Sequence, residues 1–382
     1  MKERRSKAAK HERGHELDVR IPETRPMTGV AVLPYLTVIV PCRNEARSAV
    51  RCLESILASD YPADRMEILV VDGMSSDGTA ELVDSLILQR AEQGDRRVRR
   101  IDNPERTTPV ALNRGLRAAR GEVIARVDAH ASIAPDYFMN AVRHLRTSGA
   151  DNVGGPMRTL PRHPGPFAEP IVAALSHRFG VGNSHFRTGA SQERWVDTVF
   201  GGCWPRVVFS RVGEFNEALE RSQDMEFSLR LKAAGGKTLL APDVRSDYYA
   251  RSTLGSFWRH NLLNGEWAVL PFLYSRIVPV SLRHLIPLAF VLAILAGMAL
   301  VPLTPWALGA LACAYGTANL AASMHAASTF RRPSFLILLP VTFASLHVAY
   351  GLGSLWAVLK IPGIQWSRRH ACSQPRASHS FF

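Results

Sequence analysis

The sequence of 382 residues has no acidic residue after Glu266. Eight basic residues follow that position, so they supply eight of the net +13 charges and leave +5 on the part before it. A nucleic-acid-binding protein usually gathers Lys and Arg on its folded domain, whereas here the excess flanks apolar segments. The uneven charge therefore argues against a nucleic-acid partner and favours contact with a membrane surface.

Cysteine is scarce, and the sequence shows neither a signal-peptide pattern in residues 1–30 nor a glycine-rich dinucleotide motif after the first predicted strand. The five cysteines show neither the spacing of a metal site nor an even disulfide framework, which suits a reducing compartment. Residues 1–30 contain no apolar stretch, so we expect no secretory signal peptide and predict a disordered basic arm over residues 1–33. No Gly-x-Gly-x-x-Gly follows the first predicted strand, which argues against a nucleotide-binding dehydrogenase.

Short apolar runs alternate with helical patterns over much of the chain. Such alternation predicts a doubly wound α/β domain with a largely parallel sheet, and we expect this domain to span residues 34–253. The predicted strands are residues 36–41, 66–71, 98–101, 123–127, 151–155 and 238–241, and the predicted helices are about 46–58, 80–91, 110–119, 135–146 and 171–179.

The central predicted strand, residues 123–127, is followed by a carboxylate and an imidazole. Asp128 and His130 are two residues apart, and side chains two apart on an extended segment point the same way. At the carboxyl end of a parallel strand they would lie where open α/β sheets bind their ligands. Such a pair could hold a divalent cation against a diphosphate, and the alternative is a solvated Asp beside an unrelated His.

Two later segments also carry candidate residues. Residues 156–196 are rich in Pro, Gly, His and Arg, and long irregular segments on an α/β scaffold are usually lids or substrate loops. The helix predicted to begin near Gln223 has Asp224 and Glu226 in its first turn, where acids complement the helix dipole. The same dipole would keep Asp224 ionised, as a general base requires.

The last third of the chain is apolar. Residues 254–280 mix aromatic and basic side chains and predict an interfacial amphipathic segment, with a buried core helix as the alternative. Three transmembrane helices are expected within residues 281–360, at about 285–301, 306–324 and 335–359, before a basic tail over 361–382. The flanking charges favour a cytoplasmic soluble domain on a multi-pass protein of the inner (plasma) membrane. The orientation of the third span stays open, because three crossings would put Lys360 on the outer side.

Five motifs resemble those of family 2 glycosyltransferases, in order and spacing across residues 35–245: Val38–Glu45, Val71–Thr79, Ala111–Gly115, Asp128–His130 and Gln223–Glu226. The resemblance implies an inverting, metal-dependent hexosyltransferase with the nucleotide-sugar-binding GT-A fold. The Asp-Ala-His form, the tryptophan-rich segment and the apolar tail are most similar to the succinoglycan-biosynthesis branch, which transfers glucose from UDP-glucose onto a lipid-linked sugar.

The resemblance also implies roles for single residues around the nucleotide sugar. It puts Pro41 and Glu45 in the loop that meets the nucleotide, and Asp72 at the uracil or ribose. Asn113 joins the residues expected to bind the nucleotide sugar, and Asp128 is expected at the ribose or the metal. Asp77, in the same loop region, is expected to cap a helix and not to touch the donor.

The resemblance also implies the metal ligands and the catalytic base. His130 stands where the family usually has the second Asp of an Asp-x-Asp motif, so the implied metal ligands are Asp128 and His130. Because imidazole is a poor ligand for Mg²⁺, we expect Mn²⁺, with an affinity that falls as His130 is protonated. Asp224 matches the catalytic base, and Glu226 is its structural neighbour.

Five residues, Glu226 among them, are weaker candidates for closure over the acceptor or donor. Gly202 and Trp204 could form an acceptor floor, with Trp204 in the core as the alternative. Arg259 and Trp267 could close over the donor diphosphate. The resemblance implies a lipid-linked (polyprenyl diphosphate) glycan as acceptor, in exopolysaccharide or cell-envelope synthesis. The alternatives are a polyprenyl-phosphate sugar synthase and a catalytically silent subunit of a glycan assembly complex.

Overall fold

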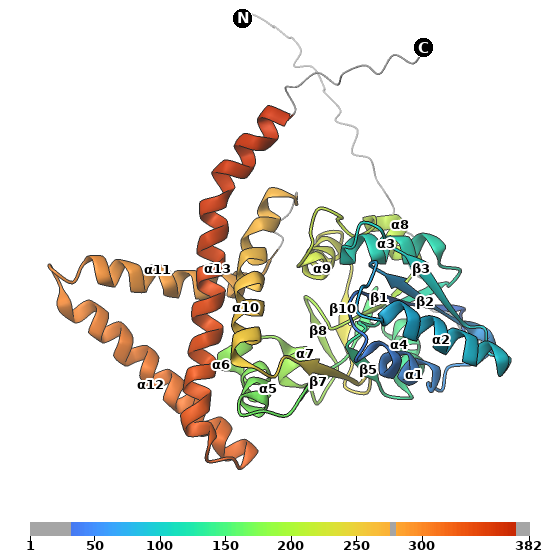
Figure 1. Cartoon of the computed structure of the whole chain (residues 1–382), viewed down its shortest axis with the longest axis horizontal. Coiled ribbons are helices and arrows are strands. Elements are labelled where there is room, and N and C mark those ends of the chain that lie inside the picture. The colour runs from blue at the N-terminus through green and yellow to red at the C-terminus, as the bar shows by residue number, and fades with distance from the viewer. Residues whose placement is uncertain (1–31, 276–279, 372–382) are drawn as a thin grey trace, which may run out of the picture.

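The computed structural model describes residues 32–275 and 280–371. The predicted basic arm falls almost entirely outside these residues, as does the end of the predicted basic tail from residue 372. Figure 1 shows an α/β body, a long helix α10 (Leu254–Val269) beside it, and three C-terminal helices. The described residues thus form a sheet domain with an attached helical part.

The body is built on an eight-stranded sheet with the strand order β3-β2-β1-β4-β9-β6-β10-β8. The first four strands in this order are parallel, as the sequence predicts. Strand β9 is antiparallel to both of its neighbours, and β8 is antiparallel to β10. The strands are β1 Leu36–Cys42, β2 Met66–Asp72, β3 Val98–Asp102, β4 Val123–Arg126, β6 Asn152–Gly154, β8 Arg194–Val196, β9 Cys203–Pro205 and β10 Thr238–Leu240.

A second, three-stranded sheet was not predicted. It consists of β5 (Ala131–Ile133), β11 (Ser246–Ala250) and β7 (Met157–Pro161), with β11 in the middle. Strand β11 runs antiparallel to β5 and parallel to β7. Because β5 begins directly after His130, this small sheet brings the segment after residue 246 next to the end of the central strand.

Helices cover both faces of the main sheet, because the apolar side chains of its strands alternate. Val38 and Val40 of β1 face one core cluster, which includes residues of α1, α2 and α4, while Ile39 faces a second, which includes residues of α3, α8 and α9. Helix α1 begins three residues later than predicted, since Glu45–Ser48 form a turn. The helices are α1 Ala49–Leu57, α2 Thr79–Glu92, α3 Thr108–Ala118, α4 Tyr137–Ser148, α5 Ala168–Ser176, α6 Arg178–Val181, α7 His185–Thr188, α8 Val207–Val212 and α9 Gln223–Ala233.

The three predicted apolar spans appear as helices, but only one of them is long and apolar enough to cross a membrane. That helix is α13 (Phe335–Ala371), of which Phe335–Gln365 meets the requirement by length and composition alone. Helix α11 (Ile286–Ala299) has 14 residues, about 21 Å at 1.5 Å per residue, which is short for a hydrocarbon layer of about 30 Å. Helix α12 (Pro305–Phe330) is long enough, but Gly, Ser, Thr and Asn dilute its apolar composition. The prediction of three transmembrane helices is therefore not supported.

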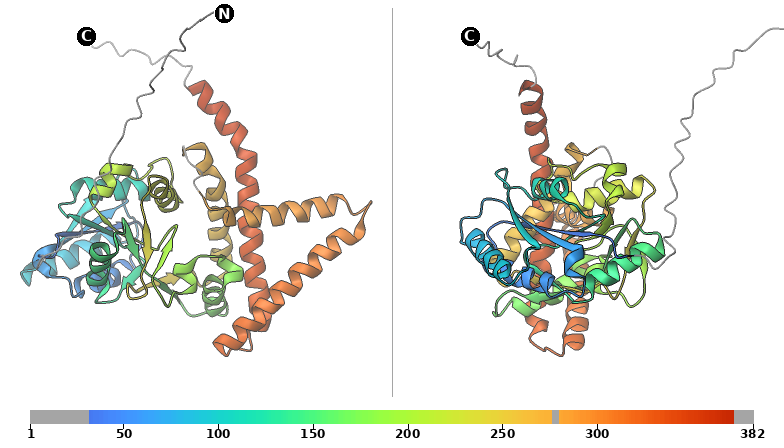
Figure 2. Two further views of the ribbon diagram at one scale, coloured as in Figure 1. Left: turned by 180° about the vertical axis from the view of Figure 1, so that it is seen from behind. Right: turned by 90° about the vertical axis from the view of Figure 1, so that its right-hand side faces the viewer.

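Helix α13 packs along the body. Gly265 of α10 and Gly353 of α13 let the two backbones approach closely, since a Cβ at either position would overlap a carbonyl oxygen of the other helix. Ion pairs join α13 and the turn before it to α10 and α5: Lys360 pairs with Glu266 of α10 at 2.6 Å, and Arg332 pairs with Glu169 of α5 at 3.0 Å. Helices α11 and α12 instead form a hairpin that stands away from the body (Figure 1 and the left view of Figure 2).

We predict that Gly265→Ala weakens the docking of α10 on α13. The added Cβ would meet the carbonyl oxygen of Tyr350, and overpacking of this kind costs about 1–3 kcal/mol. The control is Gly309→Ala on α12, where nothing lies within 4 Å of an added Cβ and the better helix propensity adds about 1 kcal/mol. Thermal unfolding in detergent should show a lower Tm for Gly265→Ala and an equal or higher one for Gly309→Ala. Equal Tm values for the two variants would contradict the close packing.

Candidate active site

Two loops at the carboxyl edge of the sheet are tied together by hydrogen bonds. The backbone N–H of Asn44, after β1, donates to Ser75 Oγ at 2.9 Å, and Ser76 N–H donates back to Asn44 Oδ1 at 2.9 Å. Asp77 accepts from the N–H of Ala46 at 3.2 Å and from the N–H of Thr79 at the start of α2. Asp77 therefore holds the start of α2 and the loop after β1, in agreement with the predicted helix cap.

Asp72 ends β2 and is buried. Its carboxylate accepts the hydroxyl of Ser75 at 2.5 Å and the N–H of the same residue at 3.0 Å. In the register of the sheet Asp72 lies opposite Cys42, one residue after Pro41. The predicted nucleotide residues Pro41 and Asp72 thus lie on neighbouring strands at one edge of the sheet.

Glu45 lies between these loops and His130. Its carboxylate accepts from Ser48 Oγ at 2.6 Å and lies 3.3 Å from His130 Nδ1 and 3.6 Å from Arg162. Burial by itself raises the pKa of the Glu45 carboxyl. The hydrogen bonds and charges of His130, Ser48 and Arg162 outweigh that effect and hold the pKa below its usual range. Glu45 is thus ionised at neutral pH and joins the nucleotide loop to His130.

Asp128 is paired with the buried arginine that ends strand β4. Arg126 Nε donates to Asp128 Oδ1 at 2.8 Å, and Arg126 is 7% exposed. Burial by itself raises the pKa of Asp128, but Arg126 and His130 outweigh it and hold the pKa below its usual range.

The expectation that Asp128 and His130 lie on one extended segment is wrong. Strand β4 ends at Arg126, and the backbone turns, with Ala131 N–H donating to the carbonyl of Asp128 at 2.8 Å. His130 leaves this turn toward Glu45, and its ring meets that of Tyr248 edge-on at 5.2 Å. His130 nevertheless stays close enough to lower the pKa of Asp128.

Asp224 lies in the first turn of α9 and is exposed. The residue before this helix, Ser222, has a positive φ of 60° and donates through Oγ to the carbonyl of Trp267 at 2.8 Å. This bond ties the start of α9 to the end of α10. Trp267 acts here through its backbone, while its ring packs among partly buried apolar residues next to α13.

The charges of Asp128 and Asp224 both act on Arg126. Burial lowers the pKa of the Arg126 guanidinium, but the charges of Asp128 and Asp224 outweigh burial and raise the pKa. The predicted base and the predicted metal ligand therefore both lie within electrostatic reach of the same buried cation.

Sequence reasoning missed three basic residues of this region. Arg126 was read as part of an apolar strand, although an arginine in such a strand is itself a signal. Arg162 and Arg187 lie in the segment predicted as a lid, where no periodicity singles them out. The guanidinium of Arg187 lies 5.4 Å from the centre of the Tyr248 ring, and burial lowers its pKa while the charge of Asp224 opposes that change.

Two of the weaker candidates lie in the core. Trp204 is 4% exposed and packs edge-on against Phe209 and Phe227. A Cβ at Gly202, which has a φ of +116°, would overlap the ring of Trp204. Trp204 therefore lies in the core, as the alternative interpretation states, and Gly202 leaves room for its ring.

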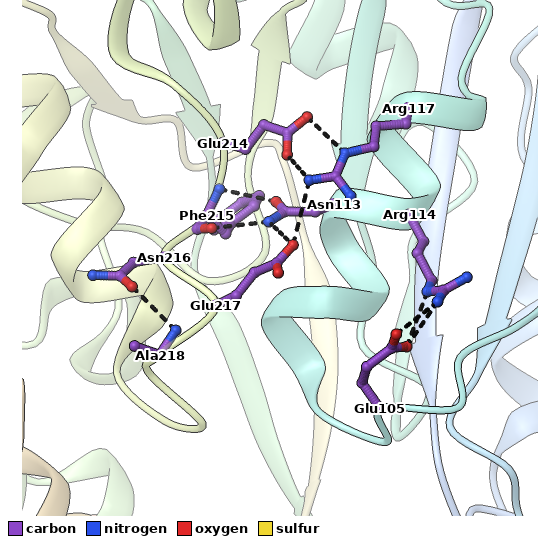
Figure 3. A network of polar contacts seen from close by, with 9 residues as sticks. All are labelled: Glu105, Asn113, Arg114, Arg117, Glu214, Phe215, Asn216, Glu217 and Ala218. Carbon is purple, nitrogen blue, oxygen red and sulfur yellow. Dashed lines mark hydrogen bonds and ion pairs between the residues drawn. The ribbon is translucent and has the colours of Figure 1, made fainter. Parts of the chain in front are cut away.

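Asn113 and Glu226 are also engaged within the fold. Asn113 Nδ2 donates to the Phe215 carbonyl at 2.9 Å and its Oδ1 accepts the Phe215 N–H at 2.9 Å (Figure 3). Both ends of its amide thus hold the loop after α8, and a contact with the nucleotide stays a prediction. Glu226 forms an ion pair with Arg230 at 3.0 Å, as expected of a structural neighbour of Asp224.

The residues at the edge of the sheet fit a divalent cation only as an open site. The described residues contain no group of three His, Cys, Asp or Glu side chains that could hold a metal ion. Asp128 uses Oδ1 for Arg126 and His130 uses Nδ1 for Glu45, so within the described residues Asp128 Oδ2 and His130 Nε2 make no hydrogen bond. Such an open pair suits a cation that takes its other ligands from the phosphates of a substrate.

The chain is similar to several known proteins. The profile of a family described as glycosyl transferase family 2 matches residues 37–204. The succinoglycan biosynthesis protein ExoA of Rhizobium meliloti is 31% identical over 280 residues, which cover 71% of this chain and 82% of that protein. Glycosyltransferase AglE of Haloferax volcanii is 27% identical, with 68% and 80% covered. The structure of a mannosyltransferase from Pyrobaculum calidifontis in complex with GDP-Man and Mn²⁺ shares the fold with a TM-score of 0.52 and 24% identity, covering 86% of this chain and 88% of that one.

We predict that Arg126→Met is destabilising by up to about 3–5 kcal/mol, because it leaves the Asp128 side chain, which is only 15% exposed, without its partner. The double variant Arg126→Met/Asp128→Asn should lose less than the sum of the two single variants, and chemical unfolding measures this cycle. The exposed pair of Arg114 and Glu105 is the control, and Arg114→Met should cost below about 1 kcal/mol.

The same pair predicts a pH dependence. Because the folded pKa of Asp128 is lowered, its stabilising effect is full above the ordinary Asp range and is lost as the pH falls through the lowered pKa. The difference in unfolding free energy between wild type and Asp128→Asn should thus be largest near neutral pH and shrink in acid. A difference that grows in acid would contradict the assignment.

Proposed function

This chain belongs to glycosyl transferase family 2, and from that premise we propose that it transfers a sugar from a nucleotide donor, with UDP-glucose as our first choice, to a lipid-linked glycan. The product would serve exopolysaccharide or cell-envelope polysaccharide synthesis, the process named for the relative from Rhizobium meliloti. The observation that carries the proposal is the buried Arg126, whose pKa responds to both Asp128 and Asp224. We assign Asp128 to the donor and Asp224 to the acceptor.

The donor would lie at the carboxyl edge of β1, β2 and β4. Two loops frame this edge, and Asn44 and Asp77 fix them to each other. Donor binding therefore requires little further ordering of these loops. Asp128 and His130 would hold a divalent cation, with Mn²⁺ preferred over Mg²⁺ because one ligand is an imidazole. When bound, the cation offsets negative charge on the diphosphate leaving group.

Asp224 would act as the general base. It is exposed at the start of α9, where a carboxylate can take the proton of the acceptor hydroxyl. The acceptor oxygen then forms its bond to the anomeric carbon while the bond from that carbon to the diphosphate breaks, and the nucleoside diphosphate leaves with the bonding electrons. Attack from the face opposite the leaving group gives inversion in a single displacement.

We predict that Asp224→Asn keeps nucleotide binding and loses most of the transfer, by about 10²–10⁴-fold, because general-base catalysis contributes that much. The assay follows Mn²⁺-dependent release of UDP from a panel of UDP-sugars by the detergent-solubilised chain, with lipid extract as the acceptor. The matched control is Glu226→Gln, which removes a carboxylate of the same helix that pairs with Arg230.

Three outcomes of this assay have a clear meaning. Release stimulated by lipid with one sugar, and lost in Asp224→Asn and Asp128→Ala, supports the proposal. Strong residual transfer in Asp224→Asn contradicts the role of Asp224 and favours a phosphate acceptor that needs no strong base. UDP binding without release from any donor, even with a defined lipid-linked sugar, favours a catalytically silent subunit.

We further propose that the C-terminal helices attach the chain to the cytoplasmic face of the inner membrane. Large apolar side chains are exposed along α11, α12 and the outward side of α13, among them Ile286, Leu303, Trp306, Ile337 and Leu359. Within the described residues α11 to α13 carry no acidic side chain. Because α13 packs against the body, the outward side of α13 and the α11–α12 hairpin are the parts proposed to enter the lipid.

Leu303 and Trp306 flank the tip of the hairpin and are 79% and 85% exposed. We predict that Leu303→Glu/Trp306→Glu reduces binding to anionic liposomes several-fold in a flotation assay, since a charged side chain inside the hydrocarbon layer costs about 3 kcal/mol. The control is Trp195→Glu, on β8 of the body, where Trp195 is 52% exposed. Equal flotation of the two variants would argue that the tip stays outside the bilayer.

A further inference from the structure

A cavity of about 430 Å³ lies along one side of α10 and is lined by Arg251, Gly255, Ser256, Arg259, His260 and Leu263. The five helical residues among these are spaced three, four, seven and eight apart, so they form one stripe on the helix. The opposite side of α10 carries Phe257, Asn261 and Gly265, which are buried, and packs toward α13. We call this cavity the α10 pocket.

The α10 pocket is lined by cations without close acidic partners. Among residues 32–275 and 280–371, no carboxylate forms an ion pair with Arg251, Arg259 or the nearby Arg221. Burial and the charge of Arg251 lower the pKa of Arg221 and outweigh the smaller opposing effects of Glu220, Tyr248 and Glu266. Guanidinium groups that repel one another in this way are stabilised when an anion binds between them.

His260 adds a polar atom without a partner. Its Nδ1 is buried and has no hydrogen bond within the described residues. Burial, together with the charges of Arg251, Arg221, Arg187 and His130, lowers the pKa of His260 to about 3. The imidazole is therefore neutral at pH 7, and a ring N–H can donate to an anion in the pocket.

The location of the pocket relates it to the candidate active site. Strand β11 leads from Tyr248, whose ring meets His130, to Arg251 at the mouth of the pocket. The stripe continues along α10 to Asn264, which accepts a hydrogen bond from Arg221, and to Trp267, whose carbonyl accepts from Ser222 beside Asp224. The pocket therefore lies between the predicted metal ligands and the helix that docks on α13.

We propose that the α10 pocket binds the diphosphate group of the lipid-linked acceptor. This inference rests on the proposed function and names a further site for its acceptor. The donor diphosphate belongs at the carboxyl edge of the sheet beside Asp128, and a second anion needs a second set of cations. An acceptor anchored in the membrane must reach Asp224 from the side of α13, and α10 forms that side of the site. Arg251 and Arg259 hold the diphosphate, so the proposal gives Arg259 a role at the acceptor in place of the expected one over the donor diphosphate. Ser256 and His260 donate to the oxygens of the acceptor diphosphate.

The test uses two ligands measured separately by calorimetry on the full chain in detergent: farnesyl diphosphate as the probe for a lipid diphosphate, and UDP with Mn²⁺. The variants are Arg251→Ala, Arg259→Ala and Arg259→Lys, and Arg114→Ala is a control that removes an exposed guanidinium of α3. We expect wild type to bind farnesyl diphosphate with UDP at saturation, and inorganic pyrophosphate to displace it.

Each alanine variant should weaken farnesyl diphosphate binding by about tenfold or more, because a charge-assisted hydrogen bond is lost. The affinity for UDP should stay unchanged, which also shows that the variant is folded. Arg259→Lys should keep most of the affinity, and Arg114→Ala should keep all of it.

Two results would overturn the inference. If UDP displaces farnesyl diphosphate, or if the UDP affinity falls in parallel in the alanine variants, the pocket belongs to the donor. If both alanine variants bind farnesyl diphosphate as wild type does, the pocket is no diphosphate site. Because neither measurement needs turnover, a chain that transfers no sugar yet shows the expected pattern would retain the pocket and refute only the proposed transfer.

Discussion

The buried ion pair of Arg126 and Asp128 is the interaction on which the candidate site depends. A guanidinium with 7% of its surface exposed is unstable without negative partners, and Arg126 lies near two of them. One partner follows on its own chain segment, and the other, Asp224, begins a helix nearly one hundred residues later. Arg126 is the last residue of β4, so its charge links the carboxyl edge of the sheet with α9.

The sequence predicts the part of this arrangement that local pattern controls. The apolar runs that form β1, β2 and β4 are continuous, as expected of strands covered on both faces, and Asp72 and Asp128 come at or just after the ends of such runs. The turn after Arg126 was missed because Val127 continues the apolar run, and its N–H still donates to the carbonyl of Ile39 on β1 at 3.1 Å, so the backbone turns only after this residue. Strand β9 was missed for a related reason, since three residues beside two glycines carry no period.

Contacts between distant segments explain most of what the sequence leaves open. His130, Arg187 and Tyr248 meet only because β11 inserts between β5 and β7. The local pattern singles out His130, but neither Arg187 nor Tyr248 stands out in its own surroundings. Trp204 illustrates the opposite case. A tryptophan after two glycines suits a sugar platform or a core equally well, and only the packing of Phe209, Phe215 and Phe227 around it decides between them.

The C-terminal helices show why hydropathy alone misplaces an apolar helix. Lipid and a protein interior present similar surroundings to a leucine, so composition cannot tell a helix surrounded by lipid from one that docks on a domain. Small residues decide the matter here, because Gly265 and Gly353 allow a backbone approach that larger side chains would forbid. Helix α10 then has two different sides, one held against α13 and one lined with cations that face the candidate site. A substrate with an apolar anchor and an anionic head would fit this arrangement. Its head would meet the cations of α10, and its anchor would lie near α13, because α10 also holds α13 against the body.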